Sequence, residues 1–527
     1  MNSDSYVRYT AREYRELEER ILDKIKSFIN KLNKVYIYGA GGFGKIAWNF
    51  LHLNDGLEKS ITGYIVADKN GNPDEICGIK VFACEEVDLT NAGVFLALDV
   101  KHHATIKTKL NILGCKEILA LEALEYYQMN WRTHILTSND INHYRELFAD
   151  NIEPPINLRE CQNILLICTD SIGDEVINIP FIRELRKNLP NGARITIVVQ
   201  PAVAQIMKKC PYIDKILIYN GKEYVGFGVE ESIEQSRIYA EKYLQSESYD
   251  IVFLHGWFSV HLEFLFLAVF SSAKLRIGFS EHNMIQKQYY NAGFDKFLSL
   301  PIVSTDVMNE VERDLYMLSA IGGKIQANEL EIWTDDRDKE FAEKLYEEYE
   351  LSEYKILAII PTASDEARIW PWESFAELLE GIAQKYEDVF FLLMGGNDAI
   401  EASKKITESV SSDRIMDLSG KTSLCEAAEI LKKSFLYVGC NTGLLHIAAA
   451  VKTPTVQIMS NAENGDPLEY AALSRYRTWG NKSYFVRPKT ALPGCGAACY
   501  MRRVHCIKQI TVDEVRSLVD KILVGDA

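Results

Sequence analysis

Short apolar runs without polar alternation recur along this chain of 527 residues, and each is followed by a polar or glycine-containing loop and then by a helical pattern. A strand that is apolar on both faces has to be covered on both sides, as strands are in parallel sheets. The repeated order of strand, loop and helix therefore predicts the α/β class with parallel sheets. At about 150 residues per domain, the length predicts roughly three such domains.

Breaks in this pattern divide the chain. A weakly periodic stretch that contains Pro154-Pro155 predicts a linker after the first α/β region. The expected division is a small Rossmann-like region over 1–130, the linker over 131–160, a second α/β domain over 161–345, and a third over 346–527 that ends in a helix. The expected strands are Val35–Tyr38, Ile61–Val66, Gly93–Leu98 and Glu117–Leu119, then Asn163–Cys168, Ile195–Val199, Lys215–Tyr219 and Asp250–Leu254, then Ile356–Ile360, Val389–Leu393, Leu436–Val438 and Thr455–Ile458.

Charge and hydropathy exclude some classes of protein. The net charge of −16 argues against a general nucleic-acid binder, because phosphate backbones demand a basic surface. The N-terminal stretch is charged throughout and shows no apolar core of a secretory signal. The most apolar run, Trp257–Ala273, carries His261 and Glu263 and is short for a bilayer, which favours a buried helix. These observations predict a cytoplasmic protein whose 11 cysteines are mostly reduced thiols.

Side chains capable of chemistry gather in loops that follow expected strands of the second and third domains. Asp174 follows Gly173 after the strand at 163–168. Two further loops, after the strands at 356–360 and 436–438, carry Thr362, Ala363, Ser364, Arg368, Asn441, Thr442, Gly443 and His446. Ligands of parallel sheets bind outside the carboxyl ends of the strands, so two such domains in tandem predict a shared ligand cleft.

These loops resemble, in the same order, the motifs of family 9 glycosyltransferases, the heptosyltransferases that build the lipopolysaccharide inner core from ADP-heptose. The resemblance covers residues 160–515. It implies the GT-B fold and an inverting transfer, without a cofactor, from a nucleotide-sugar donor to a glycan, lipid-glycan or protein acceptor, with ADP-heptose as the favoured donor and peripheral contact with the inner face of the membrane. The segments that carry it are ILLICTDSIGDEVINIPFIRELRKNLPNGARITIVV, PTASDEARIWPWESFAELL, LLMGGNDA, DLSGKTSLCEAAEILKKS and GCNTGLLHIAAAVKTPTVQIM.

Inverting transfer needs a base that takes the proton of the acceptor hydroxyl while the diphosphate leaves from the opposite face. The resemblance places the catalytic aspartate at Asp174. The alternative is a carboxylate that only stabilises the N-terminus of its helix. Asp170 and Glu175 are the rival carboxylates: the first suits a turn, and the second points about 100° away from Asp174 around the helix.

The departing diphosphate must be neutralised, and Arg368 can offer it a bidentate guanidinium group. The family generally has lysine here, and a surface arginine is the alternative interpretation. Thr362, Ala363 and Ser364 lie in the same loop and are expected to contact the donor.

The loop Asn441-Thr442-Gly443 opens a helix whose free N–H groups can bind the same diphosphate, although Asn441 or Thr442 can also act as an ordinary cap. His446 is either a ligand contact or a buried histidine of the core. Two residues depart from the family pattern, because Thr362 replaces the usual glycine and Asn441 replaces the usual aspartate. Both departures bear on the donor sugar more than on the type of reaction.

The N-terminal region has its own motif. Gly39, Gly41 and Gly44 stand in the spacing G-x-G-x-x-G between a strand and a helix, and Asp68 follows the next strand. This is the fingerprint of dinucleotide binding in its expected context, and it resembles small nucleotide-binding domains attached to sugar-modifying enzymes. A glycine turn that serves only the packing of helix on strand is the alternative. The lipopolysaccharide enzymes lack this region.

Near the C-terminus, Cys495, Cys499 and Cys506 cluster beside His505. Clustered thiols in a reducing compartment suggest a metal site, but zinc normally takes four ligands at closer pair spacing. Buried, unpaired thiols are the alternative.

The whole sequence is therefore predicted to be a heptosyltransferase-like enzyme. One alternative is a non-catalytic nucleotide-sugar binding protein that lost a carboxylate at residue 441. The other is a bifunctional fusion with a sugar-modifying N-terminal domain, for which no Tyr-x-x-x-Lys pattern is present.

Overall fold

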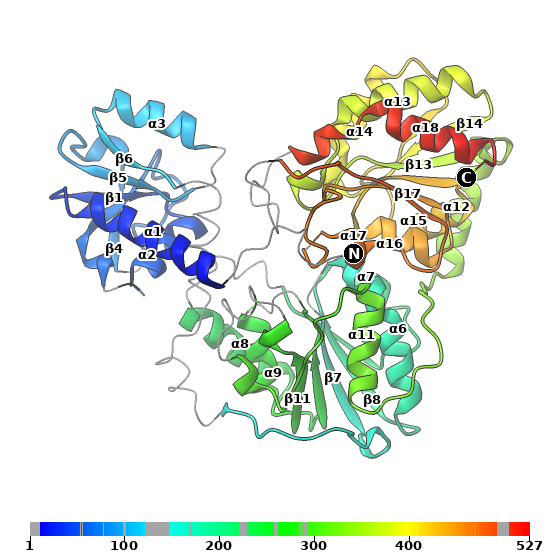
Figure 1. Cartoon of the computed structure of the whole chain (residues 1–527), viewed down its shortest axis with the longest axis horizontal. Coiled ribbons are helices and arrows are strands. Elements are labelled where there is room, and N and C mark those ends of the chain that lie inside the picture. The colour runs from blue at the N-terminus through cyan, green and yellow to red at the C-terminus, as the bar shows by residue number, and fades with distance from the viewer. Residues whose placement is uncertain are drawn as a thin grey trace.

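The computed structural model describes residues 11–526 except 53, 55, 77, 99–101, 122–146, 169–170, 221–228, 258–261, 284–286, 288–293, 470 and 493–504. Three six-stranded sheets follow one another along these residues. Figure 1 shows the first sheet and its helices on the left, the second below and the third at the upper right. The α/β class and the parallel sheets predicted from the apolar runs are confirmed.

The first sheet has the strand order β3-β4-β2-β1-β5-β6, and all its neighbouring strands are parallel except the pair β3 and β4. Its β1 and β5 strands are buried along their whole length, which is why they read as unbroken apolar runs. The elements are α1 (Ala11–Ile29), β1 (Val35–Tyr38), α2 (Gly42–His52), β2 (Ile61–Val66), β3 (Glu75–Ile76), β4 (Ile79–Ala83), β5 (Gly93–Leu96), α3 (His103–Ile112) and β6 (Glu117–Leu119).

The second sheet, which with its helices we call the central domain, is fully parallel and has the order β12-β11-β10-β7-β8-β9. Its elements are β7 (Asn163–Cys168), α6 (Ile172–Asn188), β8 (Arg194–Val199), α7 (Ala204–Met207), β9 (Lys215–Ile218), α8 (Val229–Tyr243), β10 (Ile251–Leu254), α9 (Leu262–Phe270), β11 (Leu275–Phe279), β12 (Leu300–Ile302) and α11 (Glu310–Ala320).

The third sheet, with its helices the C-terminal domain, is also parallel and has the order β15-β14-β13-β16-β17-β18. The last helix, α18, packs against α13, where Arg516 lies over Gly381 (Figure 1). The elements are α12 (Asp336–Glu348), β13 (Lys355–Ile360), α13 (Trp372–Lys385), β14 (Val389–Leu393), α14 (Ile400–Ser409), β15 (Ile415–Asp417), α15 (Leu424–Lys433), β16 (Leu436–Cys440), α16 (Gly443–Ala450), β17 (Thr455–Ile458), α17 (Leu473–Tyr476), β18 (Ser483–Val486) and α18 (Val512–Leu523).

The strand order creates one crevice in each of these two domains. In the central domain the chain runs outward from β7 in one direction and from β10 in the other, and in the C-terminal domain the same reversal falls between β13 and β16. Loops that leave such neighbouring strands diverge and open a ligand crevice at the carboxyl edge of the sheet. These are the loops in which the sequence concentrates its polar residues.

One continuous core joins the central and C-terminal domains, since buried residues such as Ile177 of α6 and Leu445 of α16 belong to the same cluster. The cysteines within the described part of the chain are buried free thiols, in agreement with the expected reduced state. Among the helices of the described residues, none is both long and apolar enough to cross a membrane.

Candidate functional site

A cavity of about 380 Å³ lies between the carboxyl edges of the central and C-terminal sheets. The central domain contributes residues of the β7–α6 loop and the loop after β8, and the C-terminal domain contributes four loops. The lining residues on which the argument depends are Ser171, Gly173, Asp174, Thr362, Ser364, Arg368, Asp398, Asn441, Thr442, Gly443, His446 and Tyr476. The structure therefore brings together all the predicted transfer-site residues except Ala363, which packs in the core of the C-terminal domain.

The N-termini of α6 and α16 lie in contact with each other at this cavity. A Cβ atom on Gly173, in the first turn of α6, would lie 2.9 Å from the Cδ2 atom of His446, and one on Gly443 would lie 2.9 Å from the Cβ of Ile172. The backbones of α6 and α16 therefore approach too closely for a side chain at either position, because Cβ atoms do not lie 2.9 Å from another carbon. Because each helix N-terminus carries partial positive charge, their meeting point suits an anion.

Asp174 lies in the first turn of α6 and faces the cavity, whereas the neighbouring Glu175 is buried. The Oδ2 atom of Asp174 accepts hydrogen bonds from the backbone N–H of Ser171 at 3.2 Å and from its hydroxyl at 2.6 Å. This is a capping box, so the helix-stabilising interpretation of Asp174 is correct as far as Oδ2 is concerned. No described residue donates a hydrogen bond to Oδ1, which leaves that oxygen for a ligand. The rival Asp170 lies outside the described residues.

His446 is a buried residue of α16 that borders the cavity. Burial lowers the pKa of its imidazole to about 4, although the charge of Asp174 acts in the opposite direction. The histidine is consequently neutral at physiological pH, and it can donate or accept a hydrogen bond without adding charge. Its ring lies 6.4 Å, centroid to centroid, from that of Tyr476, which lines the same cavity. His446 is therefore a buried histidine that borders the cavity, and its contact with a ligand stays a prediction.

The loop after β13 is fixed by the residues that follow it. The indole of Trp370 is fully buried and donates to the carbonyl of Ile510 at 3.0 Å, so the Trp-Pro pair anchors the loop. Arg368 donates to the hydroxyl of Ser364 at 2.7 Å inside the cavity lining. The hydroxyl of Thr362 donates to Asp398 at 2.9 Å, which ties this loop to the one after β14.

The N-terminus of α16 shows whether the side chain of Thr442 or Asn441 caps this helix. Thr442 is the N-cap residue, and its side chain makes no capping hydrogen bond to the helix. Asn441 is buried at the end of β16 and lines the cavity. The interpretation of the Asn441-Thr442-Gly443 loop as a side-chain cap is therefore not supported, whereas the first N–H groups of α16 remain open to the cavity.

The sequence analysis missed several contributors. Asp398 follows Gly395-Gly396 after β14, and Gly395 has a φ of 153°, a backbone conformation that favours glycine. The Gly-Gly pair after an apolar run was the available signal for a loop at the cavity. Tyr476 could not have been found in this way, because α17 has only four residues and no apolar periodicity.

A buried charged cluster lies beside the cavity, between the two domains. The Cζ atoms of Arg313 and Arg475 lie 3.9 and 4.7 Å from the centre of the Trp257 ring system, and both guanidinium groups donate to one oxygen of Glu310. Burial alone would raise the pKa of Glu310, but Arg475 and Arg313 hold it below its usual value. We call Trp257, Glu310, Arg313 and Arg475 the junction cluster.

Two more ionisable groups lie in this part of the central domain. The Nδ1 atom of His255 is 3.5 Å from Asp314, and burial raises the pKa of that carboxyl while the charge of Asp174 raises it further. Lys287 donates to the carbonyls of Gly256 and Phe279, and burial lowers the pKa of its ammonium group to about 7. The residues near Asp174 are therefore rich in ionisable side chains.

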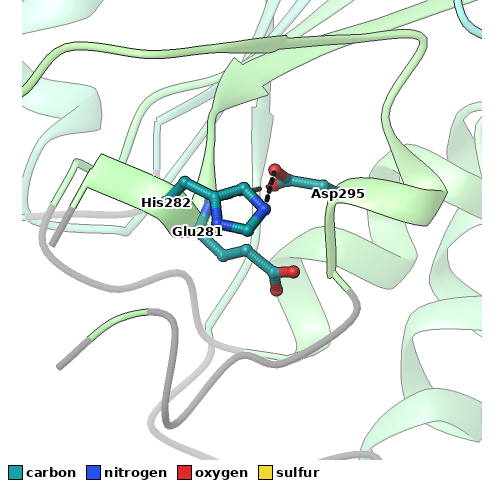
Figure 2. A group of neighbouring side chains, drawn as sticks. All are labelled: Glu281, His282 and Asp295. Atoms are coloured by element: carbon teal, nitrogen blue, oxygen red, sulfur yellow. Dashed lines mark hydrogen bonds and ion pairs between the residues drawn. The ribbon is translucent and has the colours of Figure 1, made fainter. Parts of the chain in front are cut away.

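Glu281, His282 and Asp295 form the one group of the described residues with three side chains at metal-ligand spacing (Figure 2). The oxygens of Asp295 already accept from the Ser280 hydroxyl at 2.6 Å and from the backbone N–H of Glu281 at 2.9 Å. Glu281 in turn accepts from the backbone N–H of Phe294 at 2.9 Å. These bonds join the two ends of one loop, so a structural role explains the group without an ion.

The fold requires glycine at two of the three glycine positions of the N-terminal motif. Gly39 has a φ of 116°, and a Cβ on Gly44 would lie 2.0 Å from the carbonyl oxygen of Gly39, so both are required by the fold. A Cβ on Gly41 would meet nothing within 4 Å. Asp68 accepts from the backbone and side-chain N–H groups of Asn70 in a local turn. Nucleotide binding by this region stays a prediction.

The C-terminal cysteines are only partly described. Cys495 and Cys499 lie outside the described residues. The sulfur of Cys506 is buried, 3.6 Å from Nε2 of His505, and accepts from the backbone N–H of Leu492 at 3.4 Å. The proposed metal site therefore stays a prediction.

Comparison with known proteins adds independent evidence. Residues 239–475 match the model of glycosyltransferase family 9 (heptosyltransferase). Two Escherichia coli lipopolysaccharide heptosyltransferase 3 sequences are 23% identical over 299 residues and 20% identical over 294 residues; each alignment covers 55% of this chain, and 80% and 82% of the respective relative.

Solved structures agree on the fold. A family 9 glycosyltransferase from Veillonella parvula superimposes with a TM-score of 0.54 at 16% identity, covering 70% of this chain and 99% of that one. The Escherichia coli ADP-heptose lipopolysaccharide heptosyltransferase II gives a TM-score of 0.50 at 18% identity, with 69% and 99% covered. These likenesses confirm the expected GT-B fold of two facing domains. Since the family match runs from within α8 of the central domain through α16 into α17, the chain is a glycosyltransferase that is similar to the family 9 heptosyltransferases.

Proposed function

We propose that this enzyme transfers a heptose from ADP-heptose, with inversion, to a hydroxyl of a glycan or lipid-glycan acceptor. The observation that carries the proposal is the arrangement of the cavity, in which Asp174 on the central domain faces Arg368 and the open N-terminus of α16 on the C-terminal domain. A base on one wall and an anion site on the other match the two charges that develop in a displacement at a sugar carbon.

In the proposed reaction, Oδ1 of Asp174 accepts the proton of the acceptor hydroxyl, whose oxygen forms a bond to the anomeric carbon. The bond between that carbon and the diphosphate oxygen breaks, and the electron pair leaves with the diphosphate. Arg368 and the N–H groups of α16 neutralise the leaving group. The neutral His446 contributes a hydrogen bond and no charge.

Asn441 bears on the choice of sugar. It stands in the buried cavity wall where the family usually has a carboxylate, so it offers one acceptor and one donor group in place of two acceptor oxygens. A site whose buried polar groups are left unpaired by the wrong substrate discriminates strongly against it. The donor sugar can therefore differ from the usual heptose in its hydroxyl pattern.

Competition among donors tests the proposal. We expect the full-length protein to transfer or hydrolyse ADP-heptose in preference to GDP-, UDP- and dTDP-sugars present at equal concentration, as judged by the nucleoside diphosphate that is released. A clear preference for a uridine or guanosine donor would contradict the donor assignment and leave the transferase itself intact.

Replacing Arg368 tests the anion site. We expect Arg368→Ala to weaken ADP binding about 10- to 150-fold, because a charge-assisted hydrogen bond contributes roughly 1.5 to 3 kcal/mol. Isothermal titration with ADP measures this directly. The matched control is Arg368→Lys, which restores the residue that the family generally has and should keep most of the affinity. Unchanged affinity in the alanine variant would remove Arg368 from the donor site.

A further inference from the structure

The junction cluster connects the two domains through one residue. Arg475 belongs to the C-terminal domain, whereas Glu310, Arg313 and Trp257 belong to the central domain. Its Nε atom donates to Oε1 of Glu310 at 2.7 Å, and only 1% of its surface is exposed. Arg313 donates to the same oxygen at 3.1 Å. Arg475 thus inserts a charged side chain from one domain into a buried site prepared by the other.

This site carries an excess of positive charge. Two guanidinium groups share one carboxylate, so the junction cluster holds one more cation than anions. Asp314 lies next to Arg313 on α11, and Lys287 follows β11 in the same part of the central domain. Arg475 therefore balances a buried carboxylate of the opposite domain, Glu310.

The residue that follows Arg475 lines the cavity. Tyr476, the next residue, lines the cavity and faces His446, and His446 occupies the space that a side chain at Gly173 would need. Gly173 immediately precedes Asp174. Anchoring Arg475 on Glu310 and Trp257 consequently fixes the distance between the wall that carries Asp174 and the wall that carries the anion site.

We propose that Arg475 is a positioning residue of the transfer reaction, which holds the two domains at the catalytic spacing. The inference rests on the proposed function only in that Asp174 and the anion site act from opposite walls of the cavity.

Kinetics of Arg475→Gln test this role. We expect kcat to fall at least 10-fold while the Kd for ADP changes less than twofold, because Arg368 and the N-terminus of α16 both lie on the C-terminal domain. Arg475→Lys keeps the charge that pairs with Glu310 but not the planar group over Trp257, so it should restore only part of kcat.

A control removes another hydrogen bond of the same C-terminal segment. Trp479, which does not line the cavity, donates from its indole to the carbonyl of Asn328 at 3.0 Å, and Trp479→Phe should leave kcat unchanged. Wild-type kcat in folded Arg475→Gln would overturn the proposal, as would a loss of ADP affinity as large as the loss of kcat. If the glutamine variant does not fold, the lysine variant decides: reduced kcat with unchanged ADP affinity supports the proposal, and wild-type kcat overturns it. Failure of the proposed function shows separately, as retained turnover in Asp174→Asn.

Discussion

Asp174→Asn is expected to lower the rate of sugar transfer by about 100- to 10,000-fold, the usual loss when a general base is removed. The asparagine oxygen can still accept from the N–H and hydroxyl of Ser171, so the first turn of α6 should persist and ADP should bind with near wild-type affinity. Measuring kcat and the Kd for ADP on the same preparation separates the two effects.

The control is a carboxylate in the first turn of another helix. Asp336 lies in the first turn of α12, outside the cavity, and pairs with Lys339 at 3.1 Å. Asp336→Asn should leave turnover unchanged, because it affects only the helix terminus. Near wild-type turnover in Asp174→Asn would instead show that Asp174 serves the capping box alone.

Glu310→Gln should reduce the stability of the folded protein by about 3 to 5 kcal/mol, which is typical when one partner of a buried ion pair is removed. The substitution leaves Arg313 and Arg475 buried around a neutral group. Urea unfolding at pH 7, followed by tryptophan fluorescence, measures the loss. The exposed pair of Glu234 and Arg237 provides the comparison, and Glu234→Gln should change the stability far less than Glu310→Gln does.

The loss should depend on pH in a defined direction. The pKa of the Glu310 carboxyl is held below its usual value in the folded protein. Its negative charge therefore stabilises the fold fully at any pH above the pKa that Glu310 has in the unfolded chain, and this stabilisation is lost as the pH falls through the pKa of Glu310 in the folded protein. The difference between Glu310→Gln and wild type should therefore be largest near neutrality and shrink in acid below about pH 4. A difference that grows in acid would contradict the assignment of Glu310 as a buried anion.

The sequence predicted the fold where strands are central and fully buried. The strands β7, β14 and β17 begin and end at the predicted residues, because both of their faces are covered and most of their positions are apolar. Six strands of the described residues escaped prediction, among them the short antiparallel pair β3 and β4. Arg276 and Gly278 interrupt the apolar run of β11, and β12, β15 and β18 are short outer strands whose half-exposed residues give little signal.

The site residues likewise divide into those that a local sequence pattern indicates and those that it does not. Asp174, Arg368 and Asn441 were predictable because each follows an apolar strand, and the topology then collects such loops at one edge. The capping box of Ser171 and Asp174 was also readable from its spacing. The junction cluster was not, because Trp257, Glu310 and Arg475 come from three distant segments whose meeting depends on how the two domains face each other. In the sequence, a single charged residue in such a segment cannot be distinguished from an ordinary surface residue.

The contact between α6 and α16 at Gly173 and Gly443 has a consequence for the binding of the donor and of the released nucleotide. Each helix N-terminus carries about half an elementary charge of the same sign, so two of them in contact repel one another when nothing lies between them. A diphosphate removes that repulsion, and it does so most effectively after the sugar has left, when its own negative charge is greatest. In the proposed reaction we therefore expect the site to bind the released nucleoside diphosphate more tightly than the sugar-bound donor.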